Sequence, residues 1–225
     1  MILAQDTYGF RKEVAIFTSS LERFGLHNRV KDNFLASFKR MILIEFIINS
    51  HPEISHKKFL KSIVYDVLSA MVSILQDRER YFQLNVRSMV EHIARIALQK
   101  VDSGGDFDIT VRLQDFLALK SQHQNENWNY LHQQYTQACS WLHSSSNIAL
   151  NINSTFDDLL VSDKRTNKKS MSDLLNSITK EILKTIFNYY NQPIKNAFVR
   201  SRSEFRYLIG PACFRYFEAT FTVQD

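Results

Sequence analysis

Apolar residues recur along most of the chain at intervals of three and four positions, the spacing that places side chains on one face of an α-helix. Short polar stretches separate these periodic segments. The pattern predicts helices over Phe10–Phe24, Val30–Asn49, His56–Gln76, Tyr81–Lys100, Val111–Lys120, Asn127–His143, Ser170–Tyr190 and Glu204–Phe217. We expect Ser55 and Ser170 to cap the helices that follow them, because serine side chains accept hydrogen bonds from the free N–H groups of a first helical turn.

Residues that form turns are scarce in this chain. It has 5 glycines and 3 prolines in 225 residues, which disfavours β-sandwich and βαβ folds. Its hydrophobic content of 44% is enough for a substantial core. The sequence therefore predicts an all-α protein built as an antiparallel helical bundle.

Polar segments predict how the bundle is divided. Asp102–Asp106 and Ser144–Ser154 are expected to be loops, and Val161–Lys169 is expected to be a charged, mobile connector. The connector separates a bundle core at 1–160 from a C-terminal helical section at 161–225. This section is basic and aromatic, is expected to pack on the core, and is interrupted by two prolines, Pro193 and Pro211.

The predicted helix Tyr81–Lys100 carries charges on a surface that the pattern marks as buried. One stripe is apolar, and Leu84 and Leu98 lie on the opposite side; the stripe consists of Phe82, Val86, Met89, Ile93 and Ile96. Between the two sides lie Arg87, Glu91 and Arg95, one turn apart. Burying an unpaired charge is costly, so we expect these three side chains to form an ion ladder, with Glu45 or another carboxylate as a further partner.

The same helix has a second interpretation, in which Arg87 and His92 are catalytic. Arginine stabilises the charge of a phosphate, and histidine transfers protons near neutral pH. Together they would cleave RNA without a metal, with the ribose 2′-hydroxyl as the nucleophile. Five residues rotate a helix by about 140°, so the two side chains converge only with the help of another helix or a second copy of the chain.

The predicted helix Asn127–His143 is the candidate for that second helix. Its apolar stripe is Trp128, Leu131, Tyr135, Ala138 and Leu142, and along one flank follow His132, Thr136, Cys139 and His143. The simplest interpretation is that His132 and His143 flank the core and hydrogen-bond locally. Paired CxxC or HExxH spacings do not occur, so we expect no metal and no cofactor.

Two segments, RSMVEH at 87–92 and YTQACSWLH at 135–143, resemble the all-helical bacterial proteins of the HEPN group (higher eukaryote and prokaryote nucleotide-binding). Many members of that group act in abortive infection and other anti-phage systems, and some are metal-independent ribonucleases. The resemblance implies a HEPN-like bundle in which Arg87 binds phosphate, His92 transfers the proton and His143 supports them. Ser88 stands where the family motif commonly has Asn, Asp or His. Members with degenerate motifs serve as non-catalytic binding partners.

The charge is unevenly distributed. Residues 1–160 hold 17 basic and 17 acidic side chains, whereas residues 161–225 hold 11 basic and 6 acidic ones. In the second part, aromatic residues alternate with Lys195, Arg200, Arg202, Arg206 and Arg215. Basic groups among aromatic rings bind single-stranded nucleic acid or dock a protein partner. The alternative is a helix whose aromatic rings enter the core while its arginines reach water.

The remaining features concern where the chain acts. It has no pattern of a signal peptide, its longest apolar run is too short to span a membrane, and its 2 cysteines are expected to be reduced. We therefore expect a cytoplasmic protein. The favoured function is that of an interaction subunit in an anti-phage complex, joining an effector or ATPase and contacting DNA or RNA. The alternative is a metal-independent ribonuclease that acts as a homodimer.

Overall fold

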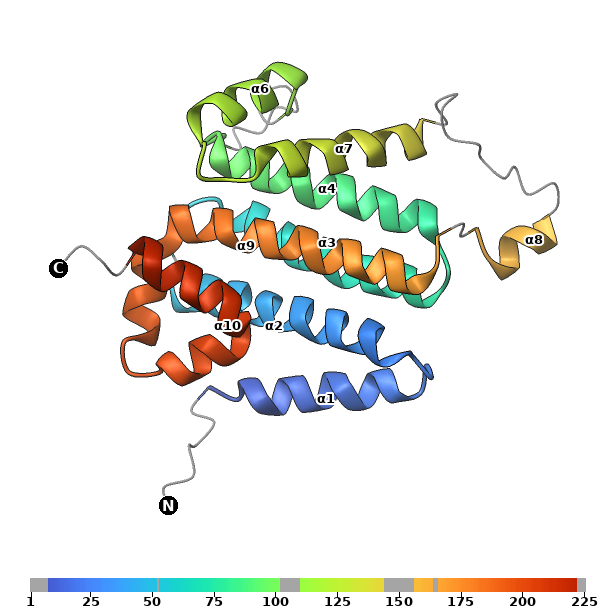
Figure 1. Ribbon diagram of the computed structural model, residues 1–225, viewed down its shortest axis with the longest axis horizontal. Coiled ribbons are helices and arrows are strands. Elements are labelled where there is room, and N and C mark those ends of the chain that lie inside the picture. Colours follow the sequence, from blue (N-terminus) through green and yellow to red (C-terminus); the bar gives the residue numbers. More distant parts are fainter. Residues whose placement is uncertain (1–7, 52, 102–109, 144–155, 164–165, 222–225) are drawn as a thin grey trace.

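Helices form where the apolar periodicity places them. The computed structural model describes residues 8–51, 53–101, 110–143, 156–163 and 166–221 (Figure 1). Its helices are α1 (Phe10–Glu22), α2 (Asn28–Ser50), α3 (Lys57–Leu75), α4 (Glu79–Ala97), α6 (Leu113–Gln122), α7 (Trp128–Leu142), α8 (Phe156–Val161), α9 (Lys168–Phe198) and α10 (Arg202–Phe221). No described residue lies in a β-strand, so the predicted all-α class is confirmed.

The long helices lie side by side in successive rows (Figure 1). Helix α1 lies against α2, which packs on α9; α9 in turn contacts α3 and α4, and α7 covers the far side of α4. Helix α10 lies across α2 and α9. Helix α9 therefore occupies the middle of the bundle.

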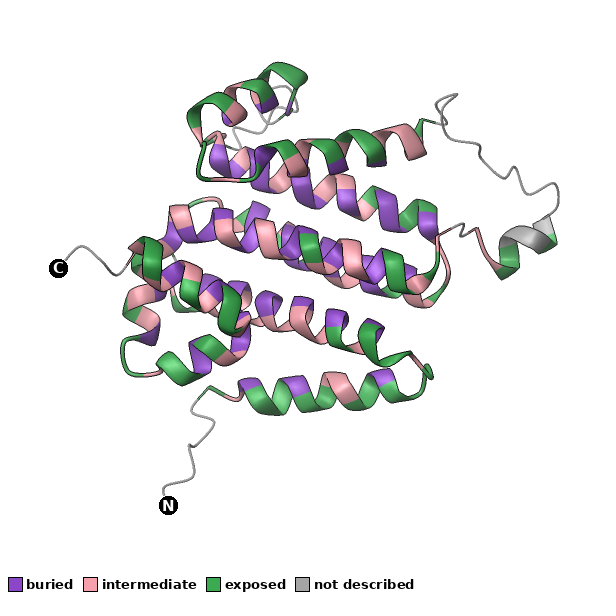
Figure 2. Ribbon diagram, viewed as in Figure 1, coloured by how far each residue is buried: buried purple, intermediate pink, exposed green. Residues whose placement is uncertain are grey.

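One hydrophobic cluster runs through the molecule, from Phe10 in α1 to Phe217 in α10. Figure 2 shows the buried faces turned toward the centre of the bundle and the exposed faces of α1, α6 and α10 turned outward. Leu175, Ile182 and Leu183 of α9 are fully enclosed. The predicted division at residue 160 therefore does not separate two hydrophobic cores, because α9 supplies a central part of the same core.

A polar seam joins α2 to α9 inside this core. Arg40, only 7% exposed, donates from Nη1 to the backbone and side-chain oxygens of Asn176 (2.9 and 2.8 Å) and to Oγ1 of Thr179 (2.8 Å). Ser37 and Thr179 are joined by their hydroxyl groups at 3.1 Å, and Asn176 donates to Asn33 at 3.0 Å. These bonds fix the register of α2 against α9.

The two predicted serine caps are wrong. Helix α9 is capped by Asn167, whose side-chain oxygen accepts a hydrogen bond from the backbone N–H of Ser170 at 2.8 Å. The cap thus lies three residues earlier, because asparagine serves this role as well as serine. Before α3, the capping position is His56 with φ of 57°, and no side chain caps the helix there.

Both predicted proline interruptions coincide with kinks in longer helices. In α9, the backbone departs from helical geometry at Tyr190, and the chain then continues helically through Pro193 to Phe198. In α10, the break is at Gly210, whose φ of 76° is accessible mainly to glycine, directly before Pro211. A proline cannot donate the helical hydrogen bond, and each helix bends just before it.

The described parts of the predicted mobile connector are fastened to the turn between α3 and α4. Asp163 accepts a hydrogen bond from the backbone N–H of Glu79 at 2.6 Å, and Thr166 donates to the Glu79 carboxylate from its backbone N–H and its hydroxyl. Lys168 pairs with Asp77 at 3.3 Å. These contacts attach the described parts of the connector to the bundle, and its mobility stays a prediction.

Two predicted loops, Asp102–Asp106 and Ser144–Ser154, lie outside the described residues. Helix α8 was not predicted, since six residues are too few to show a helical period. None of the described helices combines the length and the hydrophobicity that a bilayer crossing requires.

Candidate functional site

Helix α4 buries the apolar stripe that its sequence predicts. All five residues of the stripe are buried, from Phe82 to Ile96. The opposite side differs from the prediction, because Leu84 is 46% exposed and only Leu98 packs against the core. Leu84 faces outward beside α3, so α4 has one solvent-facing side after all.

The predicted ion ladder is reduced to one pair. Arg95 and Glu91 are joined by a salt bridge of 2.7 Å within the partly buried surface of α4. Arg87 turns instead toward α7, where its guanidinium lies 6.0 Å from the ring centre of Tyr135. Neither Arg87 nor Glu45 forms a salt bridge with any described residue. Rotation along the helix explains the split, since α4 lies between α3 and α7 and each side chain meets the neighbour on its own side.

His92 faces α3 and is held between two charged groups. Nη1 of Arg95 lies 3.1 Å from Nδ1 of His92, and Oδ2 of Asp66 lies 3.8 Å from Nε2. A guanidinium only donates hydrogen bonds, so Nδ1 is the acceptor and the neutral ring carries its proton on Nε2. That proton points toward a carboxylate too distant for a hydrogen bond. Phe59 stacks against the ring.

Burial moves both titrating groups of this pair toward their neutral forms. Desolvation, assisted by the charges of Arg95 and Lys58, lowers the pKa of His92 to about 4. Desolvation raises the pKa of Asp66 to about 6, against the effect of a hydrogen bond from Ser88. Near pH 7, the imidazole is therefore neutral and faces a buried carboxylate whose Oδ2 has no hydrogen-bond partner.

The proposed catalytic residues do not converge in one copy of the chain. Arg87 meets α7, whereas His92 meets α3. His143 is exposed at the end of α7, next to Leu142, whose carbonyl group contacts Arg80. Arg80 and His92 are twelve residues apart on α4, which corresponds to about 18 Å along its axis. His132 stacks on Phe116 at 4.5 Å, as expected for a histidine beside the core.

The two cysteines are free thiols on separate helices, Cys139 on α7 and Cys213 on α10. Burial raises the pKa of each thiol. Among the described residues, no three His, Cys, Asp or Glu side chains are grouped so that they could hold a metal ion.

The basic residues of the C-terminal section fall into two groups. Lys195 and Arg202 line one hollow together with phenylalanine rings, and Arg202 lies 6.0 Å from the ring centre of Phe214. Arg200, Arg206 and Arg215 are exposed, while the rings of Phe198, Phe205 and Phe217 are buried in the core. These three buried rings are not available for stacking with nucleic-acid bases, whereas Tyr207, Phe214, Tyr216 and Phe221 are only partly buried. Nucleic-acid binding by this section stays a prediction.

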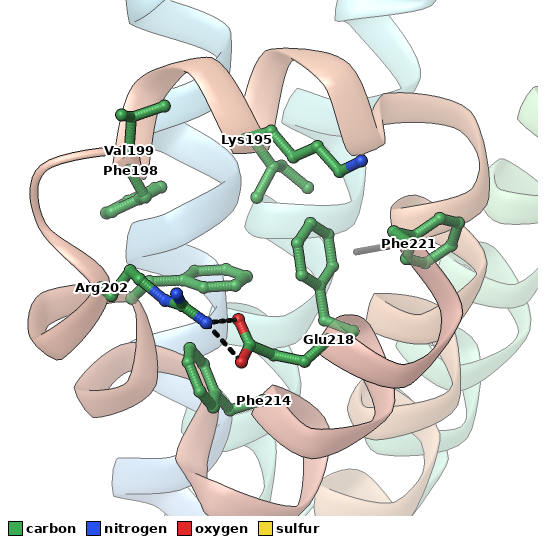
Figure 3. A pocket seen from close by; sticks show the side chains of 10 residues that line it. Lys195, Phe198, Val199, Arg202, Phe214, Glu218 and Phe221 are labelled. Carbon is green, nitrogen blue, oxygen red and sulfur yellow. Dashed lines mark hydrogen bonds and ion pairs between the residues drawn. The ribbon is translucent and has the colours of Figure 1, made fainter. Parts of the chain in front are cut away.

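A pocket of about 240 Å³ opens between the end of α9 and helix α10 (Figure 3). Its walls are mainly phenylalanine rings and aliphatic side chains, contributed by Ile194, Phe198, Val199, Phe205, Phe214, Phe217 and Phe221. Across one side, Nη2 of Arg202 donates to both carboxylate oxygens of Glu218. Lys195 lies at the pocket and forms no hydrogen bond or ion pair with any described residue.

No protein-family model, curated protein or solved structure matches the chain. The resemblance to the HEPN group therefore stays a prediction that rests on two short segments.

Sequence reasoning missed Asp66 and the pocket for different reasons. Asp66 stands among the apolar residues Ile63, Val67 and Ala70, so a charge on a core-facing stripe was a readable signal. The pocket depends on the bend at Gly210, which folds the two halves of α10 toward the end of α9. No local sequence pattern predicts that α10 folds back onto the end of α9.

Proposed function

We propose that the chain is an interaction subunit and that its C-terminal pocket receives an apolar side chain flanked by an acidic residue of a partner protein. The observation behind this proposal is an open, phenylalanine-lined pocket beside a cation, Lys195, that pairs with no described residue. A small set of polar groups beside an apolar hollow is typical of binding sites.

The size of the pocket favours a single large side chain. A cavity of about 150 Å³ lined by apolar residues holds benzene. A pocket of about 240 Å³ has room for an indole or a phenyl ring with its attached methylene group, and is smaller than the hollows that hold drug-sized ligands. Buried aromatic anchors of this kind supply much of the free energy of protein–protein binding.

The charges of the pocket favour an acidic neighbour beside that anchor. The charge of Arg202 is already neutralised by Glu218, so Lys195 provides the net positive charge. A carboxylate placed next to the anchor would pair with Lys195 at the edge of the pocket, where the surrounding rings reduce its exposure to water.

The resemblance to HEPN-group proteins supports placing this role in a cytoplasmic anti-phage complex. There the chain would join an effector or ATPase subunit to its target. This wider context rests on the two matching segments alone, whereas the docking role rests on the pocket.

A direct test uses two small probes, acetyl-Trp-Glu-amide and acetyl-Trp-Lys-amide, titrated into the full chain and followed by NMR. We expect the acidic probe to shift the Val199 methyl signals and to bind at least fivefold more tightly than the basic one. Lys195→Glu should reverse this preference. Arg215→Glu is the control, because Arg215 is exposed on α10 and does not line the pocket. Equal binding of both probes, or no binding, would contradict the proposal.

Catalysis by Arg87 and His92 is the competing function, and it needs a second copy of the chain to bring the two side chains together. Purified protein should then cleave RNA in the presence of EDTA, and His92→Ala should abolish cleavage with an unchanged unfolding temperature. A dimer in sedimentation that retains no such cleavage would remove the basis for this alternative.

A further inference from the structure

A second surface, on α3 and α4, has features that the C-terminal pocket does not explain. A groove of about 660 Å³ runs between these two helices, and an adjoining hollow continues over the first turns of α3. Tyr65 lines both hollows, so they form one surface, which we call the α3–α4 groove. It shares no lining residue with the pocket of Figure 3.

The groove gathers large apolar side chains that are left in water. Tyr65 is 71% exposed and Tyr81 is 60% exposed, while Val72 and Leu84 are 49% and 46% exposed. Single exposed apolar residues are ordinary, but several that line one hollow mark an interaction site.

These side chains form two ridges with a polar floor between them. On α3, Tyr65, Leu68 and Val72 follow each other at intervals of three and four residues, which places them along one edge. On α4, Tyr81 and Leu84 form the opposite edge. Between the ridges lie small polar residues, Ser69, Ser73, Asn85 and Ser88. Small floor residues between bulky edges leave a channel into which side chains of another helix can descend.

Charge divides the groove along its length. At the N-terminal end of α3, the lining includes Lys57, Lys58 and Lys61. Beyond Tyr65, the lining contains no lysine or arginine, and its charged member is Asp66.

Past Tyr81 and Leu84, a further hollow is lined by Arg78, Arg80 and Asp163. One end of the surface therefore carries three lysines, the other end carries two arginines beside a carboxylate, and the middle has apolar ridges over a polar floor.

We propose that the α3–α4 groove binds an amphipathic helix of a partner protein, with acidic residues in the turn that lies over Lys57, Lys58 and Lys61. The span from Lys57 to Gln76 corresponds to about 28 Å, the length of a helix of about 19 residues. Apolar residues at helical spacing fill the channel, and the lysines fix the direction in which the partner lies. This inference is independent of the C-terminal pocket.

The distribution of charge selects this occupant over nucleic acid. Surfaces that follow a single strand need cations along their length, because the strand carries a phosphate at every nucleotide. The central part of the α3–α4 groove offers a carboxylate and neutral side chains instead. Its tyrosines are accompanied by Val72, Leu68 and Leu84, which suit an apolar helix face better than a row of bases.

The test is selection from a displayed library of 19-residue amphipathic helices that share one apolar stripe and vary in the charges of both ends. We expect the full chain to enrich helices with two or more acidic residues at one end. Synthetic copies should bind at least tenfold more tightly than copies in which those residues are lysine. Lys57→Glu/Lys58→Glu/Lys61→Glu should reverse that order. Enrichment of basic or neutral ends, or no enrichment, would overturn the proposal.

Two further variants locate the contact. Tyr65→Asp and Leu84→Asp should each reduce binding at least tenfold, while Ile16→Asp, at an exposed apolar position on α1, should not change it. Circular dichroism and the unfolding temperature verify that each variant is folded. Two results would assign the groove to another occupant. If an 18-nucleotide oligouridine binds more tightly than the acidic helix, the groove binds nucleic acid instead. If the chain self-associates and Leu84→Asp abolishes that association, the groove binds a second copy.

Discussion

Two buried polar clusters show how differently this bundle accommodates a charge. In the seam between α2 and α9, amide and hydroxyl oxygens accept three hydrogen bonds from Nη1 of Arg40, while its buried Nε has no hydrogen-bond partner among the described residues. Between α3 and α4, the Asp66 carboxylate faces a neutral imidazole, and its Oδ2 accepts no hydrogen bond. Neither Arg40 nor Asp66 forms an ion pair with a permanently charged described residue.

The difference lies in what each group does to avoid an unsolvated charge. Burial lowers the pKa of Arg40, but a guanidinium stays protonated throughout the usual pH range, so its charge has to be solvated by fixed dipoles. A carboxylate can take up a proton instead, and the raised pKa of Asp66 reports that response. The α2–α9 seam is thus expected to be indifferent to pH, whereas the α3–α4 pair titrates.

The largest expected effect comes from emptying the α2–α9 seam. Arg40→Ala removes the donor of three hydrogen bonds and leaves a cavity, so the free energy of unfolding should fall by about 3–4 kcal/mol. Arg40→Met keeps most of the volume without a buried charge and should cost roughly 1–2 kcal/mol. Urea unfolding measures both. Equal losses in the two variants would mean that volume does not matter at this position.

A pH effect of intermediate size is expected for Asp66→Asn. This variant leaves His92 as the member of the pair that titrates. Its pKa of about 4 in the folded chain lies below that of an unfolded histidine, so protons bind preferentially to the unfolded state. Between pH 7 and pH 4.5, the variant should lose on the order of 2 kcal/mol more stability than the wild type. Urea unfolding at these two pH values measures the difference. Equal losses of stability in the variant and the wild type would contradict the pKa shifts assigned to Asp66 and His92.

The opposite slope is expected for His92→Gln. Asp66 then titrates alone, and its pKa of about 6 lies above that of an unfolded aspartate. Its extra proton binds to the folded state, so this contribution to stability appears as the pH falls through 6 and is lost as the pH rises again. Relative to the wild type, the variant should gain on the order of 2 kcal/mol between pH 7 and pH 4.5, because the opposing contribution of His92 is absent. In the wild type, the two opposing slopes largely cancel.

The smallest effect is expected at the exposed edge of the α2–α9 seam. Arg29 pairs with Asp173 at 2.8 Å, but the arginine is solvent-exposed. Surface ion pairs contribute little because water and salt screen them. Arg29→Gln should leave the urea midpoint within experimental error of the wild type at 0.15 M salt. A shift as large as that of Arg40→Met would show that the seam extends further outward than its burial indicates.

Prediction from sequence succeeded where a residue's role depends on its own helix. The buried stripe of α4 follows from spacing alone. In α7, Trp128, Leu131 and Ala138 are buried as the period predicts, whereas Tyr135 and Leu142 are only partly buried. Prediction from sequence failed for Arg87, which left the predicted ladder because Tyr135 of another helix lies on its side. It also failed for Leu84, which neighbouring helices leave uncovered.

The sequence by itself determined the all-α class, the main helices and the residues able to form their buried faces, because these depend on intervals of three and four along one chain. Only the tertiary structure decided that α9 lies at the centre of the bundle, that His92 meets Asp66 and that phenylalanines of α9 and α10 enclose a pocket. Those arrangements join residues far apart in the chain. Helix packing and the bends at Tyr190 and Gly210 bring these residues together, and no local sequence pattern predicts their contacts.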